Sequence, residues 1–164
     1  MLELPRIFGT TLDNIPPPIQ NLNIPDIHSI KLESPERNSL KVGIVWKTNP
    51  HHTSATKRSC KLTDFQSILD IAGITFYSLQ KEPGVDIQLL KTLPILDLSS
   101  QLNDFADTAG IITQLDLVIT VDTAVAHLAG TLGKPLMLTI IGQILRKHKV
   151  IYSQPKISIK KLLN

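Results

Sequence analysis

The segment from residue 117 to 135, LVITVDTAVAHLAGTLGKP, constrains the fold of this chain more than any other stretch. Residues 117–121 are a short apolar, β-branched run, which is typical of a strand buried on both faces. Residues 133–135 supply the glycine, the cation and the proline that commonly end a helix. Asp122 or Thr123 can provide the N-cap oxygen of that helix. The segment therefore predicts a strand, a tight turn and a helix.

The start of this predicted helix is a candidate anion site. No carboxylate follows Asp122 in the first turn, so the N–H groups of Thr123, Ala124 and Val125 face no opposing charge. These groups and the positive end of the helix dipole can receive a phosphate. The alternative is that Asp122 merely caps the helix and His127 is a half-buried structural histidine. The helix by itself does not decide between these interpretations.

The rest of the chain alternates between predicted strands and helices. Short apolar runs predict four further strands, at residues 42–46, 74–79, 94–98 and 136–140. Helical spacing and turn signals predict helices from Leu62 to the glycine stop at Gly73, over 82–93, and from an Asn103 cap to Gln114, with Phe105, Ala109 and Ile112 inward. This alternation predicts an α/β fold, a Rossmann-like doubly wound parallel sheet of about five strands in the order 3-2-1-4-5.

Changes in composition and in apolar periodicity along the chain predict three regions. Residues 1–40 contain six prolines and few periodic apolar positions, so we expect an irregular proline-rich connecting arm. Residues 41–140 carry the strand and helix patterns of the Rossmann-like domain. Residues 141–164 form a divergent basic tail.

The predicted strand order brings two loops together. The first and fourth strands are neighbours in this order, and ligands bind in the crevice at their carboxyl ends. The polar loop 47–60 should therefore face the turn at residues 122–125. An arginine side chain can donate two parallel hydrogen bonds to a phosphate, and a lysine adds a positive charge. Lys57 and Arg58 would therefore hold a diphosphate against the helix end. The loop also offers Lys47, Asn49, His51 and His52, and the alternative for each residue is a solvated basic surface.

Composition and motifs exclude several classes of function. A net charge of +3 and 4% aromatic residues do not support a nucleic-acid groove. No apolar run is long enough to span a membrane and no signal peptide pattern is present, so we expect a cytoplasmic protein. Adjacent histidines without a carboxylate or thiolate at ligand spacing predict no metal site. No glycine-rich dinucleotide or Walker motif occurs, so no cofactor is expected.

Several segments resemble one family of enzymes. DTAVAHLAGTLGKP at 122–135 resembles the motif in the C-terminal half of heptosyltransferase-like glycosyltransferases of family nine. The branch of that family found with tetratricopeptide repeats has segments similar to GIVWKTNP at 43–50, KRSCKL at 57–62, FYSLQKE at 76–82 and LNDFADTAGIITQLDLVIT at 102–120. LPRIFGTTLDNIP at 4–16 resembles the segment that joins the two halves in that branch. The resemblance covers most of the chain, to about residue 140.

The resemblance implies the second Rossmann-like domain of a GT-B glycosyltransferase, the half that binds the nucleotide diphosphate sugar. The turn whose backbone amides hold the diphosphate corresponds to Asp122, Thr123, Ala124 and Val125. His127 matches the histidine of that motif, and Arg58 matches a basic position near the phosphates. With Lys57 and Asn49 from the loop, these residues make up the predicted donor-diphosphate site. The helix start at Asp104 and Phe105 is a further candidate for the wall around the base or ribose, and it stays outside that site.

Two departures from the family pattern limit the expected activity. The family's catalytic carboxylate usually comes from an N-terminal acceptor half, which is missing from this chain, so no catalytic residue is assigned. After Pro135 the family's closing loop gives way to a tail with no counterpart in the family. We therefore expect a fragment that binds donor sugar nucleotide, with the base and acceptor site outside the chain. The alternative is a noncatalytic remnant or interaction module that retains the fold.

We predict that the purified chain transfers no sugar. Transfer needs a general base near the acceptor hydroxyl and a facing domain that holds the acceptor. Asp122 would lie on the leaving-group side, and residues 141–164 contain no side-chain carboxylate. Assays of hydrolysis and transfer with several nucleotide sugars test this. Turnover that disappears in the Asp122→Asn variant would contradict it.

Overall fold

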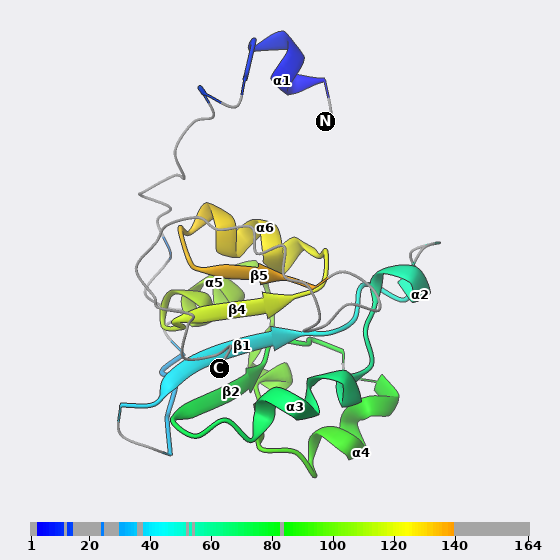
Figure 1. Ribbon diagram of the computed structural model, residues 1–164, viewed down its shortest axis with the longest axis vertical. Coiled ribbons are helices and arrows are strands. Elements are labelled where there is room, and N and C mark those ends of the chain that lie inside the picture. Colours follow the sequence, from blue (N-terminus) through cyan, green and yellow to red (C-terminus); the bar gives the residue numbers. More distant parts are fainter. Residues whose placement is uncertain are drawn as a thin grey trace.

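The chain folds around one parallel sheet. This computed structural model describes residues 3–11, 13–14, 24, 30–35, 38–51, 53, 55–82 and 84–139. Its five strands are β1 (Leu40–Val45), β2 (Ile74–Ser78), β3 (Ile95–Asp97), β4 (Leu117–Thr120) and β5 (Leu136–Leu138). Every strand pair is parallel, and the order is β3-β2-β1-β4-β5 (Figure 1). The predicted Rossmann-like α/β fold and strand order are confirmed.

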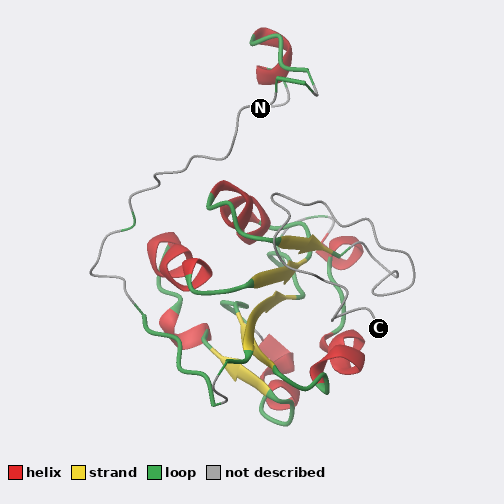
Figure 2. Cartoon of the chain, turned by 60° about the vertical axis from the view of Figure 1, so that its left-hand side comes forward, coloured by secondary structure: helices red, strands yellow, loops and turns green. Residues whose placement is uncertain are grey.

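Short helices connect the strands and cover both faces of the sheet (Figure 2). The α-helices are α1 (Leu4–Ile7), α2 (Ala55–Arg58), α3 (Gln66–Leu69), α4 (Ile87–Leu90), α5 (Phe105–Thr113) and α6 (Ala124–Thr131). The 3₁₀ turns are η2 (Leu62–Phe65), η3 (Gly84–Asp86) and η4 (Ser99–Gln101). The described part of the chain contains no helix with the length and apolar character needed to cross a membrane.

The sheet separates two apolar cores. Phe76 and the residue next to it, Tyr77, belong to different cores, because successive side chains of a strand point to opposite faces. One core contains Trp46 and Phe65, and the other contains Ile111 of α5 and Ala129 of α6. Coverage on both faces explains why the strands read as continuous apolar runs.

Helix α5 begins one residue later than predicted, and Phe105 lies at its exposed first position. Asp104, rather than Asn103, is the N-cap, and its side chain accepts hydrogen bonds from the N–H groups of Ala106 and Asp107. Phe105 is therefore the first residue of the helix, and it is 62% exposed. The prediction that Phe105 faces inward was wrong, whereas Ala109 and Ile112, also predicted to face inward, are buried.

Two predicted helices are shorter than expected. The segment from Leu62 divides into the 3₁₀ turn η2 and the single-turn helix α3. The segment 82–93 contains η3 and α4, and it becomes helical only from Gly84, whose φ of +57° cannot continue a right-handed helix from the preceding residues. The polar loop 47–60 also contains one helical turn, α2. These connections still return the chain to the same edge of the sheet.

Part of the predicted arm packs on the domain. Leu32 is buried in the core beneath α5, and its N–H donates to the Gln114 side-chain oxygen over 3.0 Å. The amide nitrogen of Gln114 donates to the Ile30 carbonyl, and the Tyr77 hydroxyl donates to the Glu33 carbonyl over 2.9 Å. Residues 30–33 therefore pack on the domain, ahead of the boundary predicted after residue 40. Most of the proline-rich stretch 15–29 and the basic tail 141–164 lie outside the described residues.

Two glycine-to-alanine substitutions should change the free energy of unfolding in opposite directions. A Cβ at Gly43 would lie 2.6 Å from Leu115 Cδ1 and 2.8 Å from Leu79 Cδ1, both in the core. We predict that Gly43→Ala destabilises the fold by about 1–3 kcal/mol. A Cβ at Gly130 in α6 meets no atom within 4 Å, so Gly130→Ala should stabilise by up to about 1 kcal/mol. Urea unfolding measures both, and equal effects would contradict this packing.

Candidate functional site

The carboxyl ends of β1 and β4 meet, as the predicted strand order requires. Val45 pairs with Thr120, and the Val121 N–H donates to the Val45 carbonyl over 3.1 Å. Arg58 of α2 crosses to the turn after β4, where its Nη2 lies 2.8 Å from the Asp122 carbonyl oxygen and 2.5 Å from Asp122 Oδ2. The loop after β1 therefore faces the turn after β4.

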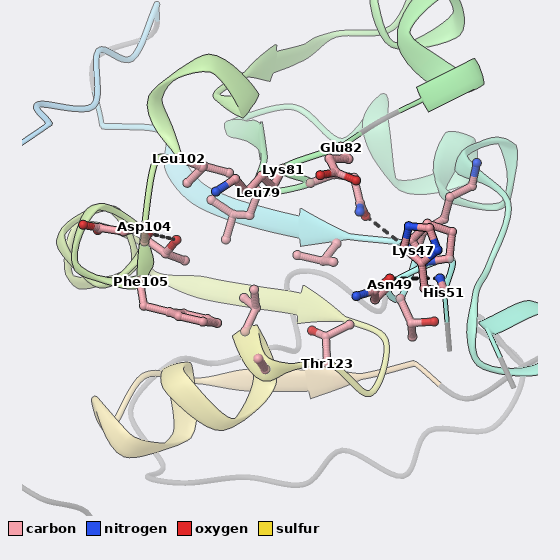
Figure 3. Close-up of a pocket in the computed structure, with 17 residues that line it drawn as sticks. Lys47, Asn49, His51, Leu79, Lys81, Glu82, Leu102, Asp104, Phe105 and Thr123 are labelled. Atoms are coloured by element: carbon pink, nitrogen blue, oxygen red, sulfur yellow. Dashed lines mark hydrogen bonds between the residues drawn. The ribbon is translucent and has the colours of Figure 1, made fainter. Parts of the chain in front are cut away.

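A pocket of about 460 Å³ opens at this edge of the sheet (Figure 3). Its walls come from the loop after β1, the residues that follow β2, and the first residues of α5 and α6. Figure 3 shows Thr123 and Phe105 on one side and Leu79 and Lys81 on the other. A volume of this size is typical of small-molecule sites.

The N-terminus of α6 is open toward this pocket. Thr123 is the N-cap residue, but its side chain makes no capping hydrogen bond, and its hydroxyl lies 3.1 Å from that of Thr120. Among the described residues, the N–H groups of Thr123, Ala124 and Val125 have no hydrogen-bond partner, and the first turn contains no acidic residue. All three residues line the pocket. They present three backbone donors at the positive end of a helix dipole.

Asp122 does not cap α6. Its carboxylate turns toward Arg58, and both side chains are partly exposed, at 55% and 33% respectively. Such a pair contributes at most about 1 kcal/mol to stability. Its larger effect is electrostatic, because it neutralises the carboxylate that lies next to the three donors.

The N-terminus of α5 has the opposite character. Asp104 accepts two backbone N–H groups of the first turn, and the Asp107 side chain accepts the N–H of Asn103 over 3.0 Å. Lys81 donates to the Asn103 carbonyl over 2.6 Å. Two N–H groups of this helix end are already engaged and the end carries two carboxylates, so it does not favour an anion.

Lys47 is also paired. Its Nζ lies 2.5 Å from Asp86 Oδ2, and the indole nitrogen of the fully buried Trp46 donates to the same oxygen over 2.7 Å. These contacts attach the end of β1 to η3 and shape the wall between them. They also offset the charge of Lys47 inside the pocket.

The structure brings together part of the predicted donor-diphosphate site. Asn49, Thr123, Ala124 and Val125 line the pocket. Asp122 and Arg58 lie beside it as an ion pair, while Lys57 and His127 are exposed and do not line it. His127 is therefore not the half-buried histidine of the alternative interpretation. His52 lies outside the described residues.

Sequence reasoning missed the contribution of the segment after β2. Gln80, Lys81 and Glu82 line the pocket, as does Thr108 of α5. The signal was present, because polar residues directly follow a predicted buried strand that neighbours the first one.

Cys60 has no place in this site. It is buried, its Sγ lies 3.9 Å from the Thr139 hydroxyl, and burial raises the pKa of its thiol. A protonated, buried thiol is a poor nucleophile. Within the part of the chain that the structure describes, no group of three or more histidine, cysteine or acidic residues could hold a metal ion.

Comparisons with protein-family models, curated proteins and solved structures gave no match for this chain. The chemistry of the pocket therefore rests on the arrangement of its own residues. That arrangement favours an anion at one place, the open end of α6.

The Arg58–Asp122 pair leads to a prediction about anion binding. We expect Arg58→Ala to weaken pyrophosphate binding by roughly fivefold, because it exposes the Asp122 charge beside the donors. Adding Asp122→Asn should restore most of the affinity, and Lys57→Ala should have little effect. Amide NMR titration of Thr123 to Val125 with pyrophosphate measures each affinity. If the double variant stays as weak as Arg58→Ala, the guanidinium contacts the phosphate directly, as the sequence suggested.

Proposed function

We propose that this chain is the donor-binding domain of a glycosyltransferase and that its pocket takes a nucleotide diphosphate sugar. The observation that carries the proposal is the open N-terminus of α6, where three N–H groups without a partner among the described residues lie at a pocket on the carboxyl edge of a parallel sheet. The resemblance of residues 122–135 to the family-nine motif supports the same assignment from the sequence.

The diphosphate would lie against Thr123, Ala124 and Val125. Hydrogen bonds from N–H groups to a charged acceptor contribute about 1.5–3 kcal/mol each, before desolvation and the lost freedom of the ligand are subtracted. Asp122, whose negative charge is balanced by Arg58, does not strongly repel the diphosphate. These terms together support weak binding, which is what a domain that closes only part of the donor site should show.

The rest of the pocket would hold the nucleoside. Leu79, Leu102 and the exposed ring of Phe105 provide apolar surface for a base. The Asp104 carboxylate is an acceptor that a ribose hydroxyl could use. The sugar would point out of the pocket, where an acceptor hydroxyl could displace the diphosphate with inversion.

The proposed role of this chain in catalysis is stabilisation of the leaving group. Charge develops on the diphosphate as the glycosidic bond breaks, and preoriented backbone donors stabilise that charge. Asp122 is engaged by Arg58 on the phosphate side of the site, which supports a base and an acceptor site outside this chain.

A titration tests the proposal. We expect UDP, ADP or GDP at millimolar concentration to shift the amide signals of Thr123, Ala124 and Val125 before others. Ala124→Pro should weaken this binding roughly tenfold or more, because it removes one donor. The helix should survive, since proline is favoured at the first helical position and Thr123 is already extended, with φ of −136° and ψ of 172°.

The matched control is Ala124→Ser, which keeps the N–H group and should bind normally. Absence of any shift at these three amides with millimolar nucleotide would contradict the proposal. It would favour a noncatalytic remnant or interaction module that keeps only the fold.

A further inference from the structure

Gln80 is a buried polar residue in the wall of the pocket. It follows β2 after Leu79, is 9% exposed, and lines the pocket. Its backbone N–H donates to the Ser78 hydroxyl over 3.3 Å. Its side-chain Oε1 accepts the N–H of Lys47, in the loop after β1, over 3.0 Å, so this loop and the end of β2 both hold Gln80 in place.

The side-chain NH₂ of Gln80 remains available. In the described part of the chain, every buried side-chain nitrogen or oxygen atom has a hydrogen-bond partner. Gln80 Nε2 makes no hydrogen bond there, so this atom keeps some exposed surface, and Gln80 is one of the residues that line the pocket. The bond from Lys47 N–H requires an acceptor at Oε1, which fixes the orientation of the amide. At this point the pocket offers a donor and no amide acceptor.

The surroundings of Gln80 suit an uncharged ligand group. The Lys47 ammonium is paired with Asp86, and Lys81 donates to the Asn103 carbonyl and has Glu82 beside it in the chain. Leu79 and Leu102 add apolar surface. A heterocycle with a neutral acceptor fits this end better than a phosphate does.

The distance from the diphosphate site also suits a base. Gln80 follows β2, whereas the open helix end follows β4, and β1 lies between them. Two strand spacings correspond to roughly 10 Å along this edge. A ribose and part of a base can span that separation.

We infer that Gln80 determines base specificity by selecting a nucleobase with a keto oxygen at position 4 of a pyrimidine or position 6 of a purine, as in uracil and guanine, over one with an amino group at that position, as in cytosine and adenine. This inference rests on the proposed function. The keto oxygen accepts from the Gln80 NH₂. An amino group at the same place would face another donor and leave both unsatisfied.

Two nucleotide pairs that exchange a keto group for an amino group at this position, together with the protonation of the adjacent ring nitrogen, test the inference. We expect the full chain to bind UDP roughly three- to tenfold more tightly than CDP, and IDP more tightly than ADP by a similar factor, which is what one net hydrogen bond supplies. Amide NMR titration measures the affinities. The Gln80 side-chain NH₂ signal, identified by its absence in Gln80→Glu, should shift with UDP.

Gln80→Glu should reverse the preference. One carboxylate oxygen can still accept the Lys47 N–H, while the other replaces the donor with an acceptor. The added charge weakens all nucleotides, but CDP should now bind more tightly than UDP. Gln66→Glu, at an exposed position in α3, adds the same charge outside the pocket and should keep the wild-type ratio.

The outcomes separate the two proposals. If nucleotides shift the Thr123 to Val125 amides but UDP and CDP bind within twofold of each other, the role of Gln80 is overturned and the donor site stands. If Gln80→Glu leaves the ratio of UDP to CDP affinity unchanged, the role of Gln80 is likewise overturned and the donor site stands. If no nucleotide binds, the proposed function fails, and this inference fails with it. If Gln80→Glu does not fold, the wild-type ratios still decide.

Discussion

Burial of the parallel sheet on both faces is the constraint on which this structure depends. Five short strands can be covered only if each crossover returns the chain to the same edge, and the two cores on either side of β1 require helices on both faces. Every segment that follows a strand therefore opens on one edge of the sheet. The pocket lies there because the apolar faces have to be covered, whatever ligand it serves.

The two helix ends at that edge divide the pocket electrostatically. At the N-terminus of α5, the Asp104 side chain accepts two backbone N–H groups, and Asp104 and Asp107 add negative charge. The N-terminus of α6 instead has N–H donors without partners among the described residues. An anion has one favourable place and a hydroxyl-bearing or neutral group has another. The polarity of the pocket thus sets an orientation for a ligand that carries both kinds of group.

Three basic residues in or beside the pocket are engaged by other groups of the chain. Arg58 holds Asp122, Lys47 holds Asp86, and Lys81 holds the carbonyl before α5. With these cations engaged, the groups that we propose to contact a ligand are ones that keep one orientation, namely backbone N–H groups and the Gln80 amide. Such groups are preorganised and lose little conformational freedom when a ligand binds, so less binding free energy is lost to ordering them.

The sequence by itself determined the fold class, the strand order and the segment that forms the open helix end, because apolar runs and helix-end signals are local. It also indicated that loop 47–60 faces residues 122–125, since strand order fixes which loops meet. The tertiary structure alone decided that Asp122 pairs with Arg58 instead of capping α6, that Phe105 is exposed, and that Gln80 is buried with its amide oriented. The Asp122 and Gln80 contacts are made with partners 64 and 33 residues away in the chain, and no local pattern specifies which partner a side chain takes.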